Sequence, residues 1–317
     1  MILRTSLRPT IAAALAPLWM LVLCAGFSGF APLVAANQFV RLDYNLTLNS
    51  RSRDTVFIEL FDDRPLTRDN FMQYVNAGKY DGTIIHRLAR NFVLQGGGFY
   101  PVFINEPPPL NVSLHPGAVV DLDGNLNTDN PTVANEFGNA PFRSNTRGTL
   151  AMAKVDGNPN SATNQWFVNW KDNGGTSPDG LDFQNGGFTV FGEVRGDGMA
   201  LYDAFNTLST SNLNPDFDDN GTRDSGPFGS TPYLGDNLVV LEKAARVDYL
   251  GGTGSSTTLN VPGTGYTIWQ RDMFIDTGAT LTGTGRLIVY LDRTLDIREG
   301  MSLSRPVANL GTLAPGL

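Results

Sequence analysis

One stretch of the chain sets an arginine, an aromatic residue and a glutamine among apolar neighbours. It contains Arg87, Phe92 and Gln95, and a run of three glycines follows directly. The apolar residues on both sides indicate two buried strand segments. A guanidinium beside apolar residues loses hydration, so burying it is costly unless it meets a group that uses its charge. Arg87 is therefore the first candidate for chemistry.

Other chemistries receive less support from the residues. Gly96-Gly97-Gly98 could suggest a phosphate loop, but no Lys followed by Ser or Thr comes after it, so a tight turn is predicted. With 2 histidines and 1 cysteine in the whole chain, a zinc or iron–sulfur site is nearly excluded. Oxygen-bearing side chains at alternate positions of 216–224 resemble the first part of a calcium loop, with a glycine in sixth place. Pro227 stands where the bidentate glutamate belongs, so a solvated acidic turn is the default interpretation. The candidate calcium ligands are Asp216, Asp218, Asn220 and Asp224.

The elements that must position Arg87 are predicted from hydrophobic periodicity and from turn residues. Thr67 can cap a helix that Gly78 ends. A second helix is predicted over 198–208. Residues 100–147 and 209–230 are rich in turn-forming residues and are predicted as surface loops. Besides the two segments around Arg87, strands are predicted over 37–48, 56–61, 148–153, 165–170, 188–194 and 238–247.

The composition is that of a globular protein. The chain has 317 residues, of which 41% are hydrophobic and 17% charged. A net charge of −8 argues against nucleic acid or an anionic membrane as the main partner. Beyond about residue 249 the sequence shifts to Gly, Thr and Ser with short alternating runs. This pattern predicts a small β-rich C-terminal extension over residues 248–317.

The N-terminus has the pattern of a targeting segment. Arg4 and Arg8 precede a long uncharged stretch over 11–30, and Val34-Ala35-Ala36 offers small residues before Asn37. We interpret residues 1–36 as a signal peptide, which predicts a periplasmic or secreted protein. A retained membrane anchor is the alternative, because the apolar stretch is long for a signal peptide. Proline and glycine residues interrupt that stretch, which favours cleavage. A membrane is a partner only if the segment is retained.

Several short blocks of the sequence resemble cyclophilins and occur in the order of that family. The ordered set is specific, although each block alone is weak. The resemblance covers roughly 38–247. It implies a mainly β fold for a domain over 37–247, in which two helices cap a closed eight-stranded antiparallel barrel. The blocks lie at 65–71, 78–83, 86–97, 148–153, 161–167 and 188–192.

The resemblance also implies an activity, peptidyl-prolyl cis–trans isomerisation of proline-containing polypeptides. Rotation about an amide has a barrier of about 18–20 kcal/mol because the C–N bond has double-bond character. The two X–Pro isomers differ by only about 0.5–1 kcal/mol, so exchange is slow although the equilibrium is nearly balanced. In the twisted amide the proline nitrogen gains a lone pair, and a donor aimed at it stabilises the transition state. The reaction makes no bond, so no cofactor is expected.

The family pattern carries roles to individual residues. Arg87 matches the catalytic arginine. Phe92, Val93, Phe167 and Leu181 would form the pocket for the proline ring, and the two glutamines would orient the substrate backbone or Arg87. Ala153 would line the floor, and the Ala153–Lys154 backbone would pair with an extended peptide. His86 corresponds to a histidine at the pocket rim and is not expected to act as a base. The predicted substrate-binding residues are His86, Phe92, Val93, Gln95, Ala153, Lys154, Gln165, Phe167, Leu181 and Phe188.

The sequence thus favours an exported bacterial prolyl isomerase that assists the folding of exported proteins. The alternative is a non-catalytic module of the cell envelope that binds proline-containing peptides or acts as a chaperone. Arg87 favours the enzyme, because a module that only binds has no need of a donor for the twisted amide.

Overall fold

The structure is a computed structural model of the chain. It describes residues 38–46, 54–103, 112–113, 131–175, 177–211, 231–234 and 237–251. In the C-terminal part it describes 258–260, 266–269, 272–275, 279–282, 286–289, 294–297, 307–309 and 312–314. The predicted signal peptide and the candidate calcium loop lie outside the described residues.

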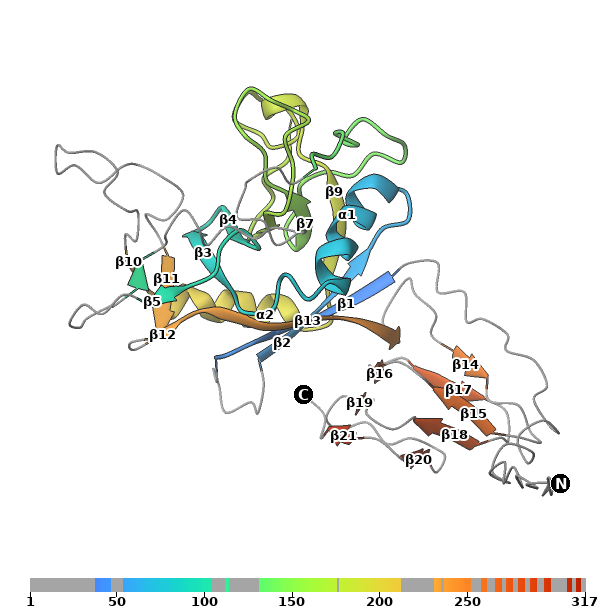
Figure 1. Cartoon of the computed structure of the whole chain (residues 1–317). Helices are drawn as coiled ribbons and strands as arrows, with labels where there is room; N and C mark the ends of the chain where they lie inside the picture. The colour runs from blue at the N-terminus through green and yellow to red at the C-terminus, as the bar shows by residue number, and fades with distance from the viewer. Residues whose placement is uncertain are drawn as a thin grey trace, which may run out of the picture.

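Eight strands form a closed antiparallel barrel (Figure 1). Each strand pairs antiparallel with its neighbours, and the first strand pairs with the last to close the ring. This arrangement confirms the predicted barrel. In order around the ring the strands are β1 (Gln38–Tyr44), β2 (Asp54–Leu60), β9 (Val190–Arg195), β7 (Thr149–Met152), β8 (Trp166–Asn169), β4 (Val93–Gly96), β3 (Thr83–Ala89) and β13 (Val240–Leu250).

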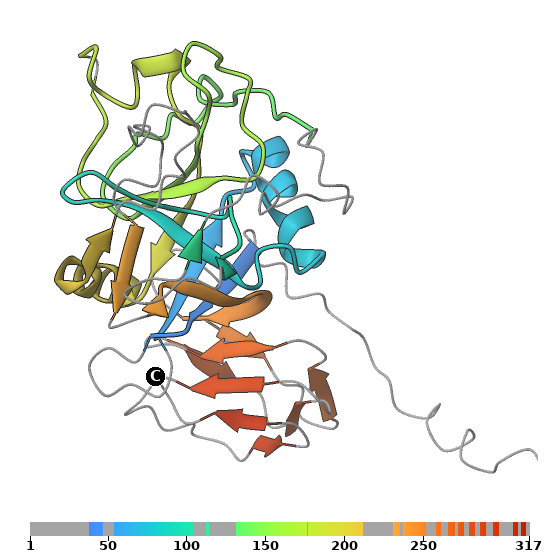
Figure 2. The same cartoon turned by 60° about the vertical axis from the view of Figure 1, so that its left-hand side comes forward.

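Two helices cap the barrel, as predicted, and lie on opposite sides of it in Figure 2. Helix α1 (Pro65–Asn76) buries Phe71 and Tyr74, and α2 (Gly198–Ala204) buries Tyr202. These aromatic side chains join the inward-facing strand residues in one large hydrophobic core. The core therefore fills the barrel, and any pocket for a peptide must lie on its outer wall.

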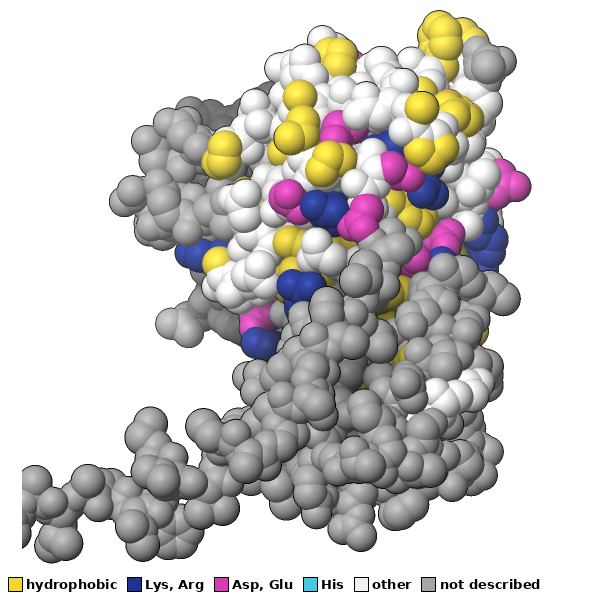
Figure 3. Space-filling view, turned by 90° about the vertical axis from the view of Figure 1, so that its right-hand side faces the viewer, with side chains coloured by type: hydrophobic (Ala, Val, Ile, Leu, Met, Phe, Trp, Pro, Cys, Tyr) yellow, Lys and Arg dark blue, Asp and Glu magenta, His cyan; other side chains and the backbone are white. Residues whose placement is uncertain are grey.

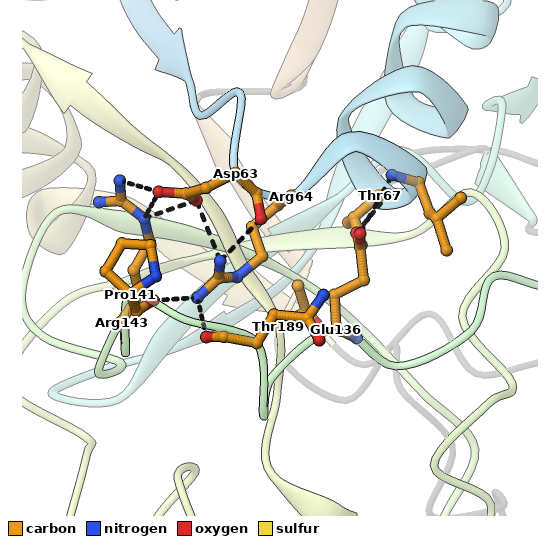
Figure 4. A network of polar contacts seen from close by, with 9 residues as sticks. Asp63, Arg64, Thr67, Glu136, Pro141, Arg143 and Thr189 are labelled. Atoms are coloured by element: carbon orange, nitrogen blue, oxygen red, sulfur yellow. Dashed lines mark hydrogen bonds and ion pairs between the residues drawn. The ribbon is translucent and has the colours of Figure 1, made fainter.

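Helix α1 begins earlier than the sequence analysis predicts. Pro65 occupies its first turn, where the missing N–H costs no hydrogen bond, and Arg64 is the capping residue. Thr67 lies inside the helix and is therefore not the cap. Its backbone N–H and its hydroxyl both donate to the Glu136 carboxylate, at 2.8 and 2.7 Å (Figure 4). A carboxylate from a distant segment thus satisfies the helix N-terminus that a local cap was expected to satisfy.

The segment 131–147 is anchored, contrary to the prediction that 100–147 is a surface loop throughout. Glu136 is 3% exposed and Asn145 is fully buried. Figure 4 shows the buried Arg64 guanidinium between Asp63 and this segment, where it donates to the Pro141 carbonyl. The asparagines and prolines correctly indicate turns, but turn chemistry does not reveal which polar side chains point inward.

The remaining short elements surround the barrel. Residues Gln184–Gly186 form the 3-10 turn η2, and Phe205–Thr207 form η3. The short strands are β5 (Val102–Phe103), β6 (Val112–Ser113), β10 (Ser209–Ser211), β11 (Thr231–Leu234) and β12 (Asn237–Leu238).

The C-terminal extension is β-rich, as predicted, but its ladders are parallel (Figure 2). Strand β13 continues beyond the barrel to Leu250 and pairs in parallel with β16, which is followed by β19 and β21. Stacked parallel ladders are typical of a β-solenoid. The strands are β14 (Thr258–Asn260), β15 (Tyr266–Trp269), β16 (Met273–Ile275), β17 (Thr280–Thr282), β18 (Arg286–Val289), β19 (Thr294–Ile297), β20 (Val307–Asn309) and β21 (Thr312–Ala314).

A separate aromatic cluster joins the extension to the outer wall of the barrel. Phe57 of β2 stacks on Phe274 of β16 with ring centroids 4.0 Å apart. Phe39 of β1 stacks on Tyr249 at 4.8 Å, and Val247 completes the cluster. The predicted domain boundary after Val247 thus falls inside a continuous strand and inside a shared apolar contact.

Within the described part of the chain, neither helix is long and apolar enough to span a bilayer. No group of three or more His, Cys, Asp or Glu side chains among the same residues could hold a metal ion. On the face shown in Figure 3, basic and acidic side chains are intermingled, so the described residues there present no continuous basic surface.

Candidate active site

Four of the outward-facing positions form a row across neighbouring strands. Arg87 of β3 lies opposite Gln95 of β4, Gln95 lies opposite Phe167 of β8, and Phe167 lies opposite Ala151 of β7. Residues directly opposite one another in antiparallel strands share a face of the sheet. Leu94, the neighbour of Gln95, belongs to the interior core, so the row faces outward. The strands thus bring residues from two distant sequence blocks onto one patch of the outer wall.

A β-bulge aims Arg87 at this patch. Ile85 pairs with Gly96, but the next pair is Arg87 with Gln95, so His86 is an extra residue in β3. In a regular ladder Arg87 would lie opposite Leu94 and point into the barrel. The bulge turns it outward instead, which is a common role of bulges beside active sites. The local sequence shows the arginine but gives no signal for the bulge.

The row borders a second apolar cluster, distinct from the interior core. The rings of Phe167 and Phe188 meet edge to face, with centroids 5.7 Å apart. Phe61, Ala151 and Val190 belong to this cluster and were missed by the sequence analysis, although strand alternation places Ala151 beside Phe167. The buried members are Phe61, Val93, Ala151, Phe167, Leu181 and Val190, and Ala89, Phe92, Ala153 and Phe188 pack against them.

Arg87 lies at the edge of this cluster. Its guanidinium carbon is 5.7 Å from the centre of the Phe92 ring, within the range of a cation–π contact. The side chain is partly buried, and this burial lowers its pKa from the ordinary value. An arginine stays protonated despite such a shift. A charged donor with reduced hydration is thus held beside an apolar pocket, where its electrostatic effect is stronger than in water.

The two predicted glutamines are bonded to each other. The Gln95 amide donates to the side-chain oxygen of Gln165 at 2.8 Å. Gln165 also lies near His86, where it opposes part of the fall in the pKa of that imidazole. The amide pair therefore lies between Arg87, which Gln95 faces across the ladder, and the bulged residue His86.

His86 has a different position from the one expected. It is completely buried, with its ring edge to face against Phe99 at 5.0 Å, and the Thr231 hydroxyl donates to its backbone carbonyl. Placement at the pocket rim is therefore wrong, because the imidazole has no exposed surface. Burial, and secondarily the charge of Arg87, lower its pKa to about 3. The ring is neutral near pH 7, and its complete burial leaves it no surface on the outer wall.

Buried asparagines hold the loop segments of the pocket. The Asn173 side chain donates to the Phe92 carbonyl at 2.8 Å, and the Asn145 side chain donates to the Phe188 carbonyl at 3.0 Å. Leu181 and Phe188 are joined by a backbone hydrogen bond of 2.9 Å. The sequence analysis missed both asparagines, because asparagine is common in turns and its spacing carries no sign of burial.

Asp182 also fixes the loop segments of the pocket. Burial raises the pKa of its carboxyl, but hydrogen bonds from the Ser144 hydroxyl, from Asn145 and from the Gly175 backbone outweigh burial and hold the pKa below its ordinary value. The ionised carboxylate therefore ties the segment around 144–145 to the loop that carries Leu181. These hydrogen bonds therefore fix the position of the segments that carry the pocket residues.

The predicted peptide-pairing residues are both next to the pocket. Ala153 packs against the apolar cluster, and its backbone N–H donates to the Gln165 carbonyl at 2.9 Å. The Lys154 ammonium is directed at a neighbouring loop, where it donates to the Asn185 and Gly187 carbonyls. The structure therefore brings all the predicted residues together around one patch, with His86 beneath it.

Comparison with known proteins agrees with this geometry. The family model of cyclophilin type peptidyl-prolyl cis-trans isomerase/CLD matches residues 45–222, more than half of the chain. The chain belongs to the cyclophilin family. Strands β1 and β13 flank the matched region, and their pairing closes the barrel of this cyclophilin. Its activity is that of a cyclophilin-type peptidyl-prolyl cis–trans isomerase.

Bacterial relatives support the assignment. The chain is 36% identical over 166 residues to peptidyl-prolyl cis-trans isomerase B of Escherichia coli, covering 52% of this cyclophilin and 85% of the relative. It is 32% identical over 189 residues to peptidyl-prolyl cis-trans isomerase A of Dickeya dadantii, covering 59% and 82%. A solved cyclophilin type isomerase of Cryptosporidium parvum aligns with a TM-score of 0.39 and 19% identity, over 66% of this chain and 97% of that one.

Proposed function

We propose that Arg87 is the catalytic group and that it acts by stabilising the twisted X–Pro amide. The observation that carries the proposal is the register of Arg87, Gln95 and Phe167 across three strands. The proposal is supported by this register because the partly buried donor lies beside an apolar cluster of aromatic and aliphatic side chains. A donor that meets the pyramidal nitrogen binds the twisted state better than the planar one, and this difference lowers the barrier.

The surrounding residues would perform the other tasks of the reaction. Val93, Phe167 and Leu181 would hold the ring and exclude water from it. Gln95 and Gln165, fixed by their mutual hydrogen bond, would orient the peptide backbone or Arg87. His86 stays neutral and transfers no proton. The reaction then needs only a positioned donor and a dry surface.

The test replaces the guanidinium and separates turnover from binding. We expect Arg87→Ala to lower kcat/KM for a short X–Pro peptide by about 10²-fold or more, as removal of one transition-state donor does. The Kd of the same peptide should change only a few-fold, because the ring pocket is intact. Arg87→Lys should recover part of the rate. Full activity of Arg87→Ala would overturn the role of Arg87, and equally negligible rates in both proteins would favour a module that only binds peptides.

We further propose that the protein acts on proline-containing polypeptides outside the cytoplasm. The support is the sequence pattern of residues 1–36, with two arginines before a long apolar stretch and small residues at 34–36. Expression of the full chain in a bacterium, followed by mass analysis of each cell fraction, tests this. Export predicts a periplasmic or secreted chain that begins at Asn37. A full-length chain in the membrane fraction would instead indicate an anchor, and one in the cytoplasm would refute export.

A further inference from the structure

The loop that delivers Phe188 to the pocket has an unusual backbone. Asn185, Gly186 and Gly187 all have positive φ, at 51°, 74° and 75°. Glycine adopts positive φ freely and asparagine tolerates it, so these residue types do not by themselves fix one conformation of the loop. Phe188 follows directly, and its ring meets Phe167 inside the apolar cluster. The position of this aromatic wall therefore depends on what fixes the loop.

Lys154 is one of the residues that hold this loop. Its ammonium donates to the Asn185 carbonyl at 2.8 Å and to the Gly187 carbonyl at 2.6 Å. The same nitrogen lies 4.5 Å from the centre of the Phe188 ring, in a cation–π contact. An ammonium has three donors on one compact charge, which suits two converging carbonyls and a ring face. Lys154 thus contacts both the loop and the wall that the loop carries.

Asn135 also holds this loop. The Asn135 amide donates to the Gly186 carbonyl at 2.8 Å and to the Gly187 carbonyl at 3.1 Å. Asn135 in turn accepts the Thr189 hydroxyl at 2.7 Å. Gly187 packs so tightly on Phe137 that an added Cβ would come within 2.1 Å of that ring. Asn135 is uncharged. Among the described contacts to these three carbonyls, the one from Lys154 is the contact whose charge a single substitution removes.

We propose that Lys154 is a positioning residue that sets the proline pocket by holding Phe188 against it through the 185–187 loop. The inference rests on the proposed pocket. It differs from the expected role of Lys154, in which the backbone at 153–154 pairs with the peptide. The side chain acts on the substrate through Phe188. Because the wall contacts the ring in the planar and twisted states alike, Lys154 contributes to binding more than to turnover.

The experiment compares three variants of the full chain with a blocked Ala-Pro peptide as the probe. Lys154→Met keeps the length of the side chain and removes its charge, and Lys154→Arg keeps the charge. Lys171→Met is the matched control, since Lys171 is exposed. We expect Lys154→Met to raise Kd and KM about fivefold or more while kcat stays within about twofold. Lys154→Arg should recover part of the lost affinity, because it keeps the charge but not the compact ammonium. Lys171→Met should stay within about twofold of the wild type.

These outcomes separate the inference from the role of Arg87, since Arg87→Ala lowers kcat at nearly unchanged Kd. An unchanged Kd in Lys154→Met would overturn the inference. So would a fall in kcat that Lys154→Arg does not restore, because Lys154 would then act in the transition state.

The Kd of the wild type, measured over a series of pH values, tests the Lys154 contact without a substitution that removes the charge. Burial lowers the pKa of Lys154 to about 8. The charged groups on the segments packed against it are Glu136, which binds the α1 N-terminus, the anchored Asp182, and exposed Asp156. The Lys154 ammonium loses its charge, and with it both contacts, as the pH rises through about 8. The wild-type Kd should therefore rise several-fold above pH 8, whereas Lys154→Arg should hold its Kd. A flat wild-type profile, or the same rise in Lys154→Arg, would overturn the inference.

Discussion

The side chains of Gln95 and Gln165 are joined by a hydrogen bond of 2.8 Å, although 70 residues separate them in the sequence. Gln95 lies opposite Arg87, and Gln165 lies near the buried His86. The pair therefore connects the proposed catalytic donor with the residue whose insertion turns that donor outward. Each glutamine depends on the other for its orientation, and this dependence can be measured.

Replacing either glutamine by leucine should impair catalysis to a similar extent. We expect Gln95→Leu and Gln165→Leu each to lower kcat/KM by about tenfold, since each loses one positioned amide and leaves the other without its partner. The double variant should be little worse than either single one. A double-mutant cycle on kcat/KM should give a coupling of about 0.5–3 kcal/mol. Strictly additive losses would mean that the two amides act independently.

The buried His86 should make the fold sensitive to mild acid. Its pKa is about 3 in the folded chain, because of burial and the Arg87 charge, against 6.5 for an ordinary histidine. Below about pH 6.5 the unfolded chain binds a proton that the folded chain excludes, so this contribution to stability is present above that pH and is lost as the pH falls towards 3. The loss approaches about 1.4 kcal/mol per pH unit.

Urea unfolding between pH 7 and pH 5 checks this, with His86→Gln as the comparison. At position 86 the variant keeps a hydrogen-bonding side chain that does not titrate in this range, so its stability should fall less steeply. His115 is present in both proteins and cancels in the difference. Parallel slopes for the two proteins would show that His86 is protonated in the folded state as readily as in the unfolded one.

The positions of the site residues were predictable because strand alternation and family spacing constrain the same residues. Gln95 and Phe167 occupy outward positions in strands whose inward neighbours are large and apolar, so the pattern fixes their face. Ala153 follows directly after β7. The barrel followed from the order of the blocks. The predicted position of His86 was wrong, because the bulge breaks the alternation at that residue. The residue types on either side give no sign of a bulge.

Features that depend on contacts between distant segments were also hidden in the sequence. Glu136 supplies the helix N-terminus with a carboxylate from 69 residues away, so the local choice of Thr67 as the cap was wrong. The parallel ladders of the extension look like any alternating strands, because alternation reports burial and not the direction of the partner. Asn145 and Asn173 are buried through tertiary hydrogen bonds that turn composition does not encode.

The glycine run after Gln95 makes a prediction about folding. Gly97 has a φ of +78°, and an added Cβ would come within 2.5 Å of the Trp166 ring nitrogen. Gly97→Ala should therefore destabilise the barrel by about 2 kcal/mol or more, because backbone strain and a core clash add. Gly82→Ala is the matched control, since Gly82 has a φ of +81° and nothing within 4 Å of an added Cβ. Chemical unfolding should show about 1 kcal/mol for the control. Equal losses in the two variants would show that the core absorbs the clash.

The aromatic contact between barrel and extension predicts that the two unfold together. Phe274 is 2% exposed and stacks on Phe57 of the barrel wall. Phe274→Ala should cost about 3–5 kcal/mol, the usual loss for a buried phenylalanine, and should lower the transition of the barrel itself. Phe142→Ala is the control, since Phe142 is 66% exposed and its loss should stay within about 0.5 kcal/mol. Calorimetry should show one transition that shifts in Phe274→Ala. Two transitions, of which only the smaller moves, would mean that the extension folds independently and that the boundary near Val247 separates two domains.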